Sequence, residues 1–284
     1  LRWRPSPWAL LNFRIWTAFP AGKAGAVETQ FFWDERAATL EEQTTQPIQD
    51  HIEMGFTGEN GDSSLNDLLN KLMAHDYYQE LCRLAFGDEQ LNENRMQLAL
   101  AQFVRSIQSF DSKYDEGRQV VNSDGPDFPN FSAQENLGKR LFMSTVGAGG
   151  AFCSACHIPP EFDINLVSHN NGVIGVAGNP NAVDLNNTRA PSLRDLVNAQ
   201  GRLNGPMMHN GEFPTLMSVI NHYDSIPNDD NNLNLDPHLR RSDLSTQRLH
   251  LTDSEKQALI AFLKTLAGTN VYTDPKYGNP FLKP

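Results

Sequence analysis

Two cysteines and one histidine in the segment AFCSACHI (151–158) are the side chains of this sequence best suited to hold a cofactor. Cys153 and Cys156 are separated by two residues and His157 follows directly, which is the C-x-x-C-H pattern of c-type haem attachment. Thiols at that spacing lie on one helical face and can reach the two vinyl groups of one porphyrin, while the adjacent imidazole can bind the iron. The motif predicts one covalently attached haem c with His157 as its proximal ligand.

Two other uses of a Cys-x-x-Cys pair fit the sequence less well. A thioredoxin-like redox pair follows a strand at the start of a β-α-β unit, and no such alternation surrounds residue 153. A structural zinc site needs four ligands, whereas the sequence holds 3 cysteines and the third, Cys82, lies in the distant segment YYQELCRLAFG. We expect Cys82 to be an inert buried thiol.

Composition limits the class of protein. The chain has 284 residues, enough for one large or two modest domains whose core can enclose a cofactor. Its formal net charge of −11 and the absence of a basic stripe argue against nucleic acid as a partner. No apolar run of about 18 residues is present, so no membrane span is predicted. Thioether attachment of haem implies maturation outside the cytoplasm, which predicts the periplasm of a bacterium. The start at Leu1 without a signal-peptide pattern predicts a mature or truncated form.

The hydrophobic pattern is helical, with long irregular connections. Capping boxes of the form Ser/Thr-x-x-Glu predict helix starts at 39–42, 132–135 and 252–255. Amphipathic periodicity predicts helices over 64–75, over the stretch around Cys82 that ends at Gly87, over 95–110 and over 251–266. Residues 117–131 are rich in Pro, Gly and Asn and predict a linker, while 158–214 predicts loops. Strand alternation is scarce, so the predicted class is all-α with long loops.

An internal repeat indicates two related domains. The segment FFWDERAATLEEQ (31–43) aligns without a gap with MMHNGEFPTLMSV (207–219). The C-x-x-C-H motif precedes the second copy, whereas the first copy would carry its own motif upstream of this chain. We therefore expect two cytochrome c-like haem domains. The first, 1–118, lacks its C-x-x-C-H segment, and the second, 119–284, contains the motif.

Several motifs in a fixed order resemble the bacterial dihaem cytochrome c peroxidases and the related MauG-type enzymes, over essentially the full length of the chain. The segments that carry the resemblance are FFWDERAATLEEQ (31–43), PIQDHIEMG (47–55), LGKRLF (137–142), CSACH (153–157), HNNG (169–172), RAPSLRD (189–195), GPMMHNGEF (205–213) and VYTDPKYGNPF (271–281). The resemblance implies two c-type haems in two similar domains, with a calcium ion between them. It also implies that the N-terminal haem activates hydrogen peroxide, while the C-terminal haem stores or passes electrons.

The resemblance implies roles for residues of the first domain. Trp33 resembles the tryptophan between the haems, where an aromatic ring can relay electrons. Glu53 resembles the distal carboxylate, which can move a proton between peroxide oxygens. Gln43 and Pro47 match residues that line the distal pocket. His51 is expected to be exposed to solvent rather than catalytic.

The resemblance also bears on the second axial ligand of the C-terminal iron. A methionine raises the potential and suits electron transfer, and Met207 and Met208 are available. The family's ligand position, however, lies further along, where this sequence has Tyr223, and MauG-type members carry tyrosine there. A phenolate favours ferric and higher oxidation states. Tyr223 is the predicted ligand, with Met208, Met207, His222 or an open position as alternatives.

Asn12, Asn204 and Pro206 resemble the calcium positions of the family, where hard cations take oxygen ligands. The function implied is a periplasmic dihaem oxidoreductase that uses hydrogen peroxide. Its reductant is either a small electron-donor protein or an aromatic side chain of a partner protein, and a homodimer is compatible with the resemblance. Two alternatives stay open, namely a monohaem electron-transfer cytochrome and a haem-bearing subunit of a larger assembly.

Overall fold

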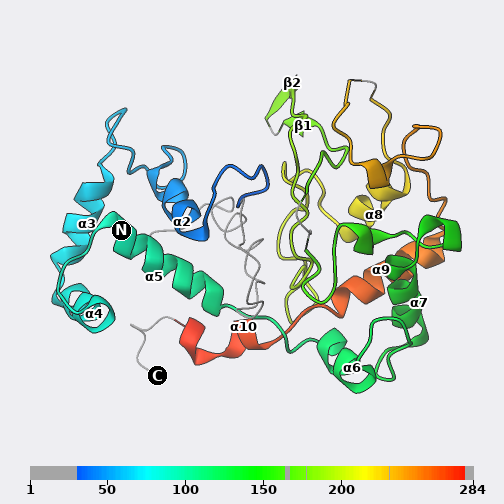
Figure 1. Ribbon diagram of the computed structural model, residues 1–284, viewed down its shortest axis with the longest axis horizontal. Helices are drawn as coiled ribbons and strands as arrows, with labels where there is room; N and C mark the ends of the chain where they lie inside the picture. The colour runs from blue at the N-terminus through cyan, green and yellow to red at the C-terminus, as the bar shows by residue number, and fades with distance from the viewer. Residues whose placement is uncertain (1–30, 164–166, 177, 230, 279–284) are drawn as a thin grey trace. The chain divides into compact units, whose positions relative to one another are not determined.

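The computed structural model describes residues 31–163, 167–176, 178–229 and 231–278 (Figure 1). The chain divides into two compact units, Leu1–Ile107 and Gln108–Pro284. The boundary expected after residue 118 would cut the helix α6 (Lys113–Val121), whose Tyr114 is fully buried in the core of the second unit. The second unit therefore begins before this helix.

The described residues are helix-rich, which confirms the predicted all-α character. The helices of the first unit are α2 (Leu40–Gln49), α3 (Leu65–Met73), α4 (Asp76–Phe86) and α5 (Glu93–Ser106). Besides short 3-10 turns, the remaining elements described in the second unit are α7 (Ala133–Met143), β1 (Gly175–Val176), β2 (Asn179–Val183), α8 (Leu216–Asp224), α9 (Asp253–Lys264) and α10 (Asn270–Thr273). Within the described ranges, β1 and β2 form one short antiparallel pair. None of the helices in these ranges is long and apolar enough to cross a bilayer.

Local sequence signals set the helix starts. Thr39, Ser132 and Thr252 each accept a hydrogen bond from the backbone N–H three residues later, as their capping boxes predicted. Two predictions differ from the structure. The helix expected over 95–110 ends at Ser106, because the backbone of Ile107 is extended. The linker expected over 117–131 begins inside α6.

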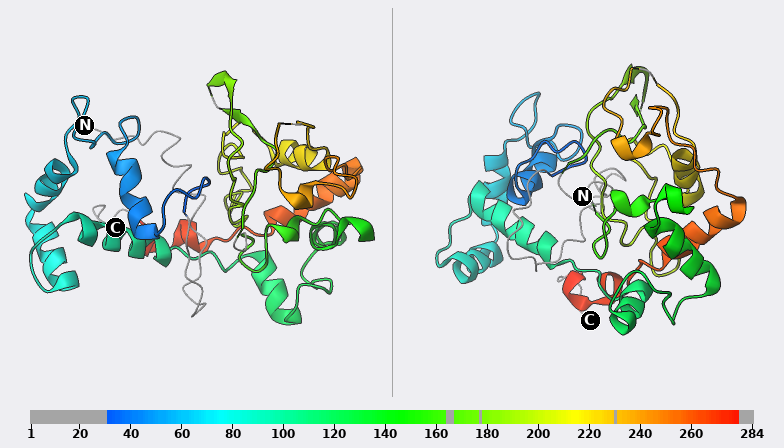
Figure 2. Two further views of the ribbon diagram at one scale, coloured as in Figure 1. Left: turned by 45° about the horizontal axis from the view of Figure 1, so that its top comes forward. Right: turned by 45° about the vertical axis from the view of Figure 1, so that its right-hand side comes forward.

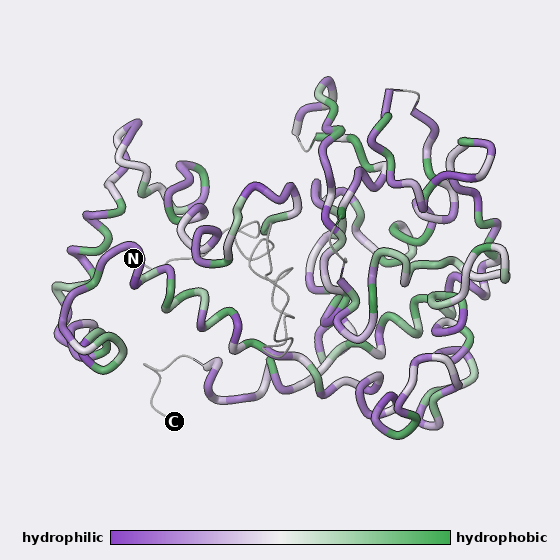
Figure 3. Tube along the Cα trace, in the orientation of Figure 1, coloured by the Kyte–Doolittle hydropathy of each residue, from purple (hydrophilic) through white to green (hydrophobic). Residues whose placement is uncertain are grey.

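In the first unit, α2 packs against α5 (Figure 2). Hydrophobic and hydrophilic residues alternate along α5 with helical periodicity (Figure 3), so one side of the helix is apolar. The apolar side buries Ala101 and Val104 against Phe31, Phe32 and Leu40. Cys82 is 4 % exposed on α4 and is a free thiol, which confirms its predicted burial.

In the second unit, α7 and α9 cross at close range. A Cβ atom added to Gly138 of α7 would lie 1.9 Å from the carbonyl oxygen of Ala258 in α9. Glycine is therefore required for this approach. Around the crossing, the rings of Phe142, Phe162 and Phe262 pack at centroid distances of 5.2 to 6.1 Å. The chain leaving this crossing carries the C-x-x-C-H segment.

We predict that Gly138→Ala destabilises the protein by about 1–3 kcal/mol or more, because the new methyl group overlaps the backbone of α9. Urea unfolding of the haem-loaded protein measures the effect. Gly147→Ala is the control, since a Cβ there meets nothing within 4 Å. Equal stability of the two variants would contradict the close helix crossing.

Candidate haem site

The C-x-x-C-H segment forms a short 3-10 turn, Cys153–Ala155, shortly after the end of α7. Phe152 enters the turn with a left-handed backbone (φ 53). The carbonyl oxygen of Cys153 accepts the N–H of Cys156 at 3.2 Å and that of His157 at 2.9 Å. All three side chains thus leave one turn. A helix rather than a strand precedes them, unlike the start of a thioredoxin-like β-α-β unit.

Burial keeps all three groups neutral at ordinary pH. It raises the pKa of the Cys153 thiol to about 12, and likewise the pKa of the Cys156 thiol to about 12, with a smaller contribution from Asp236. It lowers the pKa of His157 to about 4. Both cysteines are free thiols. A neutral imidazole is the form that binds iron.

Two backbone carbonyls fix the orientation of the His157 ring. Nδ1 lies 3.1 Å from Phe162 O and 3.0 Å from Pro191 O. Carbonyl oxygens only accept, so Nδ1 carries the proton and Nε2 presents its lone pair. A hydrogen bond to the non-ligating nitrogen is the usual way in which a metal-binding histidine is held. The residue predicted as proximal ligand is therefore oriented for that role.

Arg194 holds the loops that supply these carbonyls. Its side chain is fully buried and pairs with Asp115 of α6 at 2.7 Å. It also donates to Pro160 O at 2.8 Å and to Ser109 O at 2.7 Å. Sequence reasoning missed this network, although both participants lie in visible signals. Arg194 belongs to RAPSLRD, and Asp115 is the fourth residue of the capping box Ser-Lys-Tyr-Asp.

The structure brings Tyr223 together with the two cysteines. It lies in the last turn of α8, and its side chain packs beside Ile226 and Leu235. Burial raises the pKa of its phenol, and the nearby thiols of Cys156 and Cys153 raise it further. The predicted distal group thus stands close to the haem-attachment cysteines.

The alternative ligands have other contacts. Met207 packs against the main core of the second unit. His222 is buried, and its Nε2 donates to Asn171 O at 2.9 Å. Met208 has a left-handed backbone (φ 66), and its Sδ lies 3.9 Å from Asn171 Nδ2.

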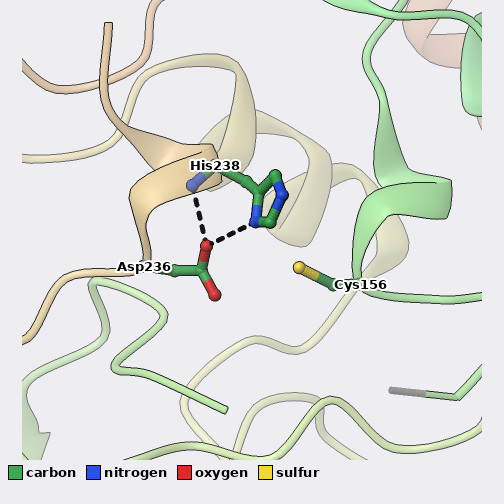
Figure 4. A group of neighbouring side chains, drawn as sticks. All are labelled: Cys156, Asp236 and His238. Carbon is green, nitrogen blue, oxygen red and sulfur yellow. Dashed lines mark hydrogen bonds and ion pairs between the residues drawn. The ribbon is translucent and has the colours of Figure 1, made fainter. Parts of the chain in front are cut away.

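Cys156 also lies beside Asp236 and His238, and their ligand atoms lie within 4.8 Å of one another (Figure 4). One oxygen of Asp236 accepts both the backbone N–H of His238 at 2.8 Å and its ring Nδ1–H at 2.9 Å. Asp236 is thereby engaged by His238. Cys156 is one of the two thiols of the C-x-x-C-H motif. We therefore assign Asp236 and His238 to the residues that surround the haem-attachment site.

In the first unit, the predicted site residues lie on and around α2. Gln43 is buried, and Pro47 is half-buried one turn further along the same helix. Trp33 is half-buried in the segment before α2. Glu53 is half-buried in the turn after α2, where Asp50 Oδ1 accepts its backbone N–H at 3.1 Å.

His51, in the same turn, is exposed as expected and pairs with Asp62 at 2.8 Å. The position of Glu53 differs from that of an isolated surface acid, because its side chain is partly covered.

The internal repeat is visible in the backbone. Phe31 pairs with Ala37 as Met207 pairs with Phe213, each through an antiparallel bridge. Phe32 has φ 67 where Met208 has φ 66. The aligned residues Thr39 and Thr215 cap α2 and α8, which begin at the aligned residues Leu40 and Leu216. A bridge, a left-handed residue, a threonine cap and a helix thus recur in both units.

Continuing this ungapped alignment places Pro47 opposite Tyr223. Both lie near the end of the repeated helix. At this equivalent position, the first unit therefore has a side chain that cannot bind a metal, whereas the second unit has a phenol.

The predicted calcium residues are only partly described. Asn204 Nδ2 donates to Asp195 O at 2.6 Å and to the hydroxyl of Tyr272 at 2.7 Å. Pro206 is exposed. Asn12 lies outside the described residues.

The residues of the second unit fit a haem c. Two neutral thiols and an oriented neutral imidazole share one turn, and a phenol stands near the thiols. The two thiols could attach a haem through thioethers, and the imidazole could bind its iron. Fold and site together define a c-type haem domain.

Comparison with known proteins narrows the class. The family model for di-haem cytochrome c peroxidase matches residues 12–121. The methylamine utilization protein MauG of Methylophilus methylotrophus is 33% identical over 246 residues, which cover 83% of this chain and 63% of MauG. Cytochrome c551 peroxidase of Nitrosomonas europaea is 26% identical over 270 residues, which cover 89% of this chain and 65% of the relative. The chain thus spans less than two thirds of these curated relatives.

Comparison with solved structures points to the same class of protein. A MauG-like protein associated with microbial copper homeostasis superposes with a TM-score of 0.66 at 25% identity, covering 89% of this chain and 76% of that one. The diheme peroxidase BthA from Burkholderia thailandensis superposes with a TM-score of 0.58 at 21% identity, covering 84% and 66%, and shares the fold. The predicted resemblance to the dihaem cytochrome c peroxidases and MauG proteins is confirmed over most of the chain.

Proposed function

We propose that this chain is part of a periplasmic dihaem oxidoreductase that uses hydrogen peroxide. The observation that carries the proposal is the repeat, which places Pro47 in the first unit where Tyr223 stands in the second. A proline has no group that can bind iron, so that position stays open to a small substrate. A tyrosine at the equivalent position can close the second haem.

In the second unit, Cys153 and Cys156 would attach the haem, His157 would bind the iron on one side and Tyr223 on the other. The neutral thiols and the ring orientation of His157 support this assignment. When bound, the haems would supply iron that accepts peroxide at the first unit and stores oxidising equivalents at the second. The haem of the first unit would be attached by a C-x-x-C-H segment that is not among these 284 residues.

In the first unit, Glu53 would move a proton between the two oxygens of peroxide, because its partly covered carboxyl follows the helix that carries Pro47. Gln43 and Pro47 would line the peroxide site on one face of α2. Trp33 would relay electrons through its ring. The name of the peroxidase relative supports peroxide as the substrate.

Two classes of reductant fit the proposal. A small electron-donor protein would give water from peroxide, as the name of the Nitrosomonas relative suggests for that protein. An aromatic side chain of a partner protein is the alternative, which phenolate ligation by Tyr223 favours because it stabilises oxidised iron. The sequence identity to MauG is the higher of the two. Calcium bound at Asn12, Asn204 and Pro206 and a homodimer remain part of the prediction.

We predict that Glu53→Gln slows the reaction of the haem-loaded protein with hydrogen peroxide by about 10²- to 10⁴-fold, because the amide cannot transfer the proton. Stopped-flow absorbance after mixing with peroxide measures the rate. The control is Glu59→Gln, an exposed acid in the following loop, which should react like the wild type. If the two variants react at the same rate, Glu53 has no part in peroxide cleavage.

We predict that Tyr223→Phe changes the ferric absorption spectrum and raises the reduction potential of the second haem, because an anionic oxygen ligand to ferric iron is lost. Absorption spectroscopy and redox titration measure both quantities. Tyr77→Phe, at a tyrosine 44% exposed on α4, is the matched control. An unchanged ferric spectrum in Tyr223→Phe would rule out tyrosine ligation.

A further inference from the structure

Helices α5 and α9 end in a shared sequence motif, which extends the internal repeat. Residues 99–107 read ALAQFVRSI and residues 258–266 read ALIAFLKTL, and the two segments align without a gap. Alanine, leucine and phenylalanine are identical at three of the positions. Four other positions exchange similar residues, namely Val for Leu, Arg for Lys, Ser for Thr and Ile for Leu. The motif makes α5 of the first unit the equivalent of α9 in the second.

The structure supports this equivalence. Ser106 Oγ donates to Phe103 O at 2.7 Å, and the aligned Thr265 Oγ1 donates to Phe262 O at 2.6 Å. The same hydrogen bond therefore closes the same turn of both helices. In addition, α2 packs on α5 as α8, its equivalent in the repeat, packs on α9.

In the second unit, α7 crosses α9 directly over this motif (Figure 1). A Cβ atom added to Gly138 of α7 would lie 1.9 Å from Ala258 O and 2.8 Å from Phe262 Cβ. The rings of Phe142 and Phe262 lie 5.2 Å apart. Ala258 and Phe262 are both 0% exposed. Residues four apart share one face of a helix, so this alanine and this phenylalanine form the surface on which α7 lies.

In the first unit, the equivalent surface is accessible within the described residues. Ala99 aligns with Ala258 and is exposed, and Phe103 aligns with Phe262 and is 45% exposed. Another side of the same helix is buried, because Ala101 packs against α2. The two side chains that α7 covers in the second unit are thus accessible in the first.

The order of elements along the chain indicates which segment would cover this surface. In the second unit, α7 is the helix that precedes the C-x-x-C-H segment. Under the proposed function, the C-x-x-C-H segment of the first unit is not among these 284 residues. The helix that precedes that segment would then lie upstream as well.

We propose that Ala99 and Phe103 of α5 form the docking face for an amphipathic helix that precedes the C-x-x-C-H segment of the first unit in the same full-length polypeptide. That helix carries a glycine over Ala99, as Gly138 lies over Ala258, because the close crossing leaves no room for a Cβ. The inference rests on the proposed function, since that function requires an upstream haem-attachment segment.

Photocrosslinking from position 103 tests the occupant in the full-length, haem-loaded protein. With p-benzoylphenylalanine in place of Phe103, irradiation should join α5 to a peptide N-terminal to the first C-x-x-C-H segment, identified by mass spectrometry. Leu98 is the control position, because its equivalent Gln257 is exposed with α7 in place, and it should give no such link. A link from position 103 to the second unit or to another chain, or no link, would overturn the proposal.

A substitution at the crossing point tests the closeness of the contact. Ala99→Leu should raise the unfolding equilibrium constant of the full-length protein by about 5- to 150-fold, as expected of an overpacked contact. Urea unfolding measures the change. Asn94→Leu is the matched control on the same helix, because Asn94 and its equivalent Asp253 are both exposed. Equal stability of the two variants would mean that no helix crosses closely at Ala99.

The number of covalent haems separates this inference from the function on which it rests. If the full-length protein holds two haems and position 103 does not link to the upstream peptide, the attachment segment stands and the docking face is wrong. If it holds one haem, the upstream attachment segment is wrong and the docking helix falls with it.

Discussion

The hydrogen bonds from the His157 ring to two backbone carbonyls are the contacts on which the second unit depends. They come from Phe162 and Pro191, two loop positions brought together by the fold. Neither loop has regular secondary structure at that point, so Arg194 supplies the rigidity through its buried pair with Asp115. A buried pair of this kind is weak evidence for stability but fixes geometry well. The helix crossing, the clamped loops and the neutral imidazole together produce one result, a ring nitrogen presented to iron.

Duplication explains how one scaffold can serve two different haem environments. The bridge, the left-handed residue and the threonine cap recur around Phe31 and Met207, so the helix that follows enters each unit in the same way. The backbone is repeated while the side chains near the helix end differ. Pro47 offers no ligand atom, whereas Tyr223 offers an ionisable oxygen beside the attachment cysteines. Under the proposed function, the exchange of Pro47 for Tyr223 on a common backbone is the difference that would leave one haem open to substrate and close the other.

The sequence predicted what depends on local chemistry. The capping residues Thr39 and Ser132 marked helix starts, and the C-x-x-C-H motif marked a turn with both thiols and the imidazole. Helix α6 was not predicted, because the Pro, Gly and Asn residues that follow it indicate a linker and its capping box was overlooked. The carbonyl partners of His157 could not be predicted from the sequence, since every residue has a carbonyl and only the fold decides which one faces the ring. The pairing of Arg194 with an acid far away in the chain was invisible for the same reason. Tyr223 was found through the family resemblance and not through its own surroundings.

The most direct measurement is the number of haems per polypeptide, from pyridine haemochrome absorbance and the intact mass of the purified protein. For the full-length protein, whose first unit would carry a C-x-x-C-H segment that is not among these 284 residues, we predict two covalent haems, one of them on the tryptic peptide that contains Cys153 and Cys156. One haem per polypeptide would contradict it. Peroxide chemistry at the first unit would then have no iron, and Trp33 and Glu53 would lose the roles proposed for them.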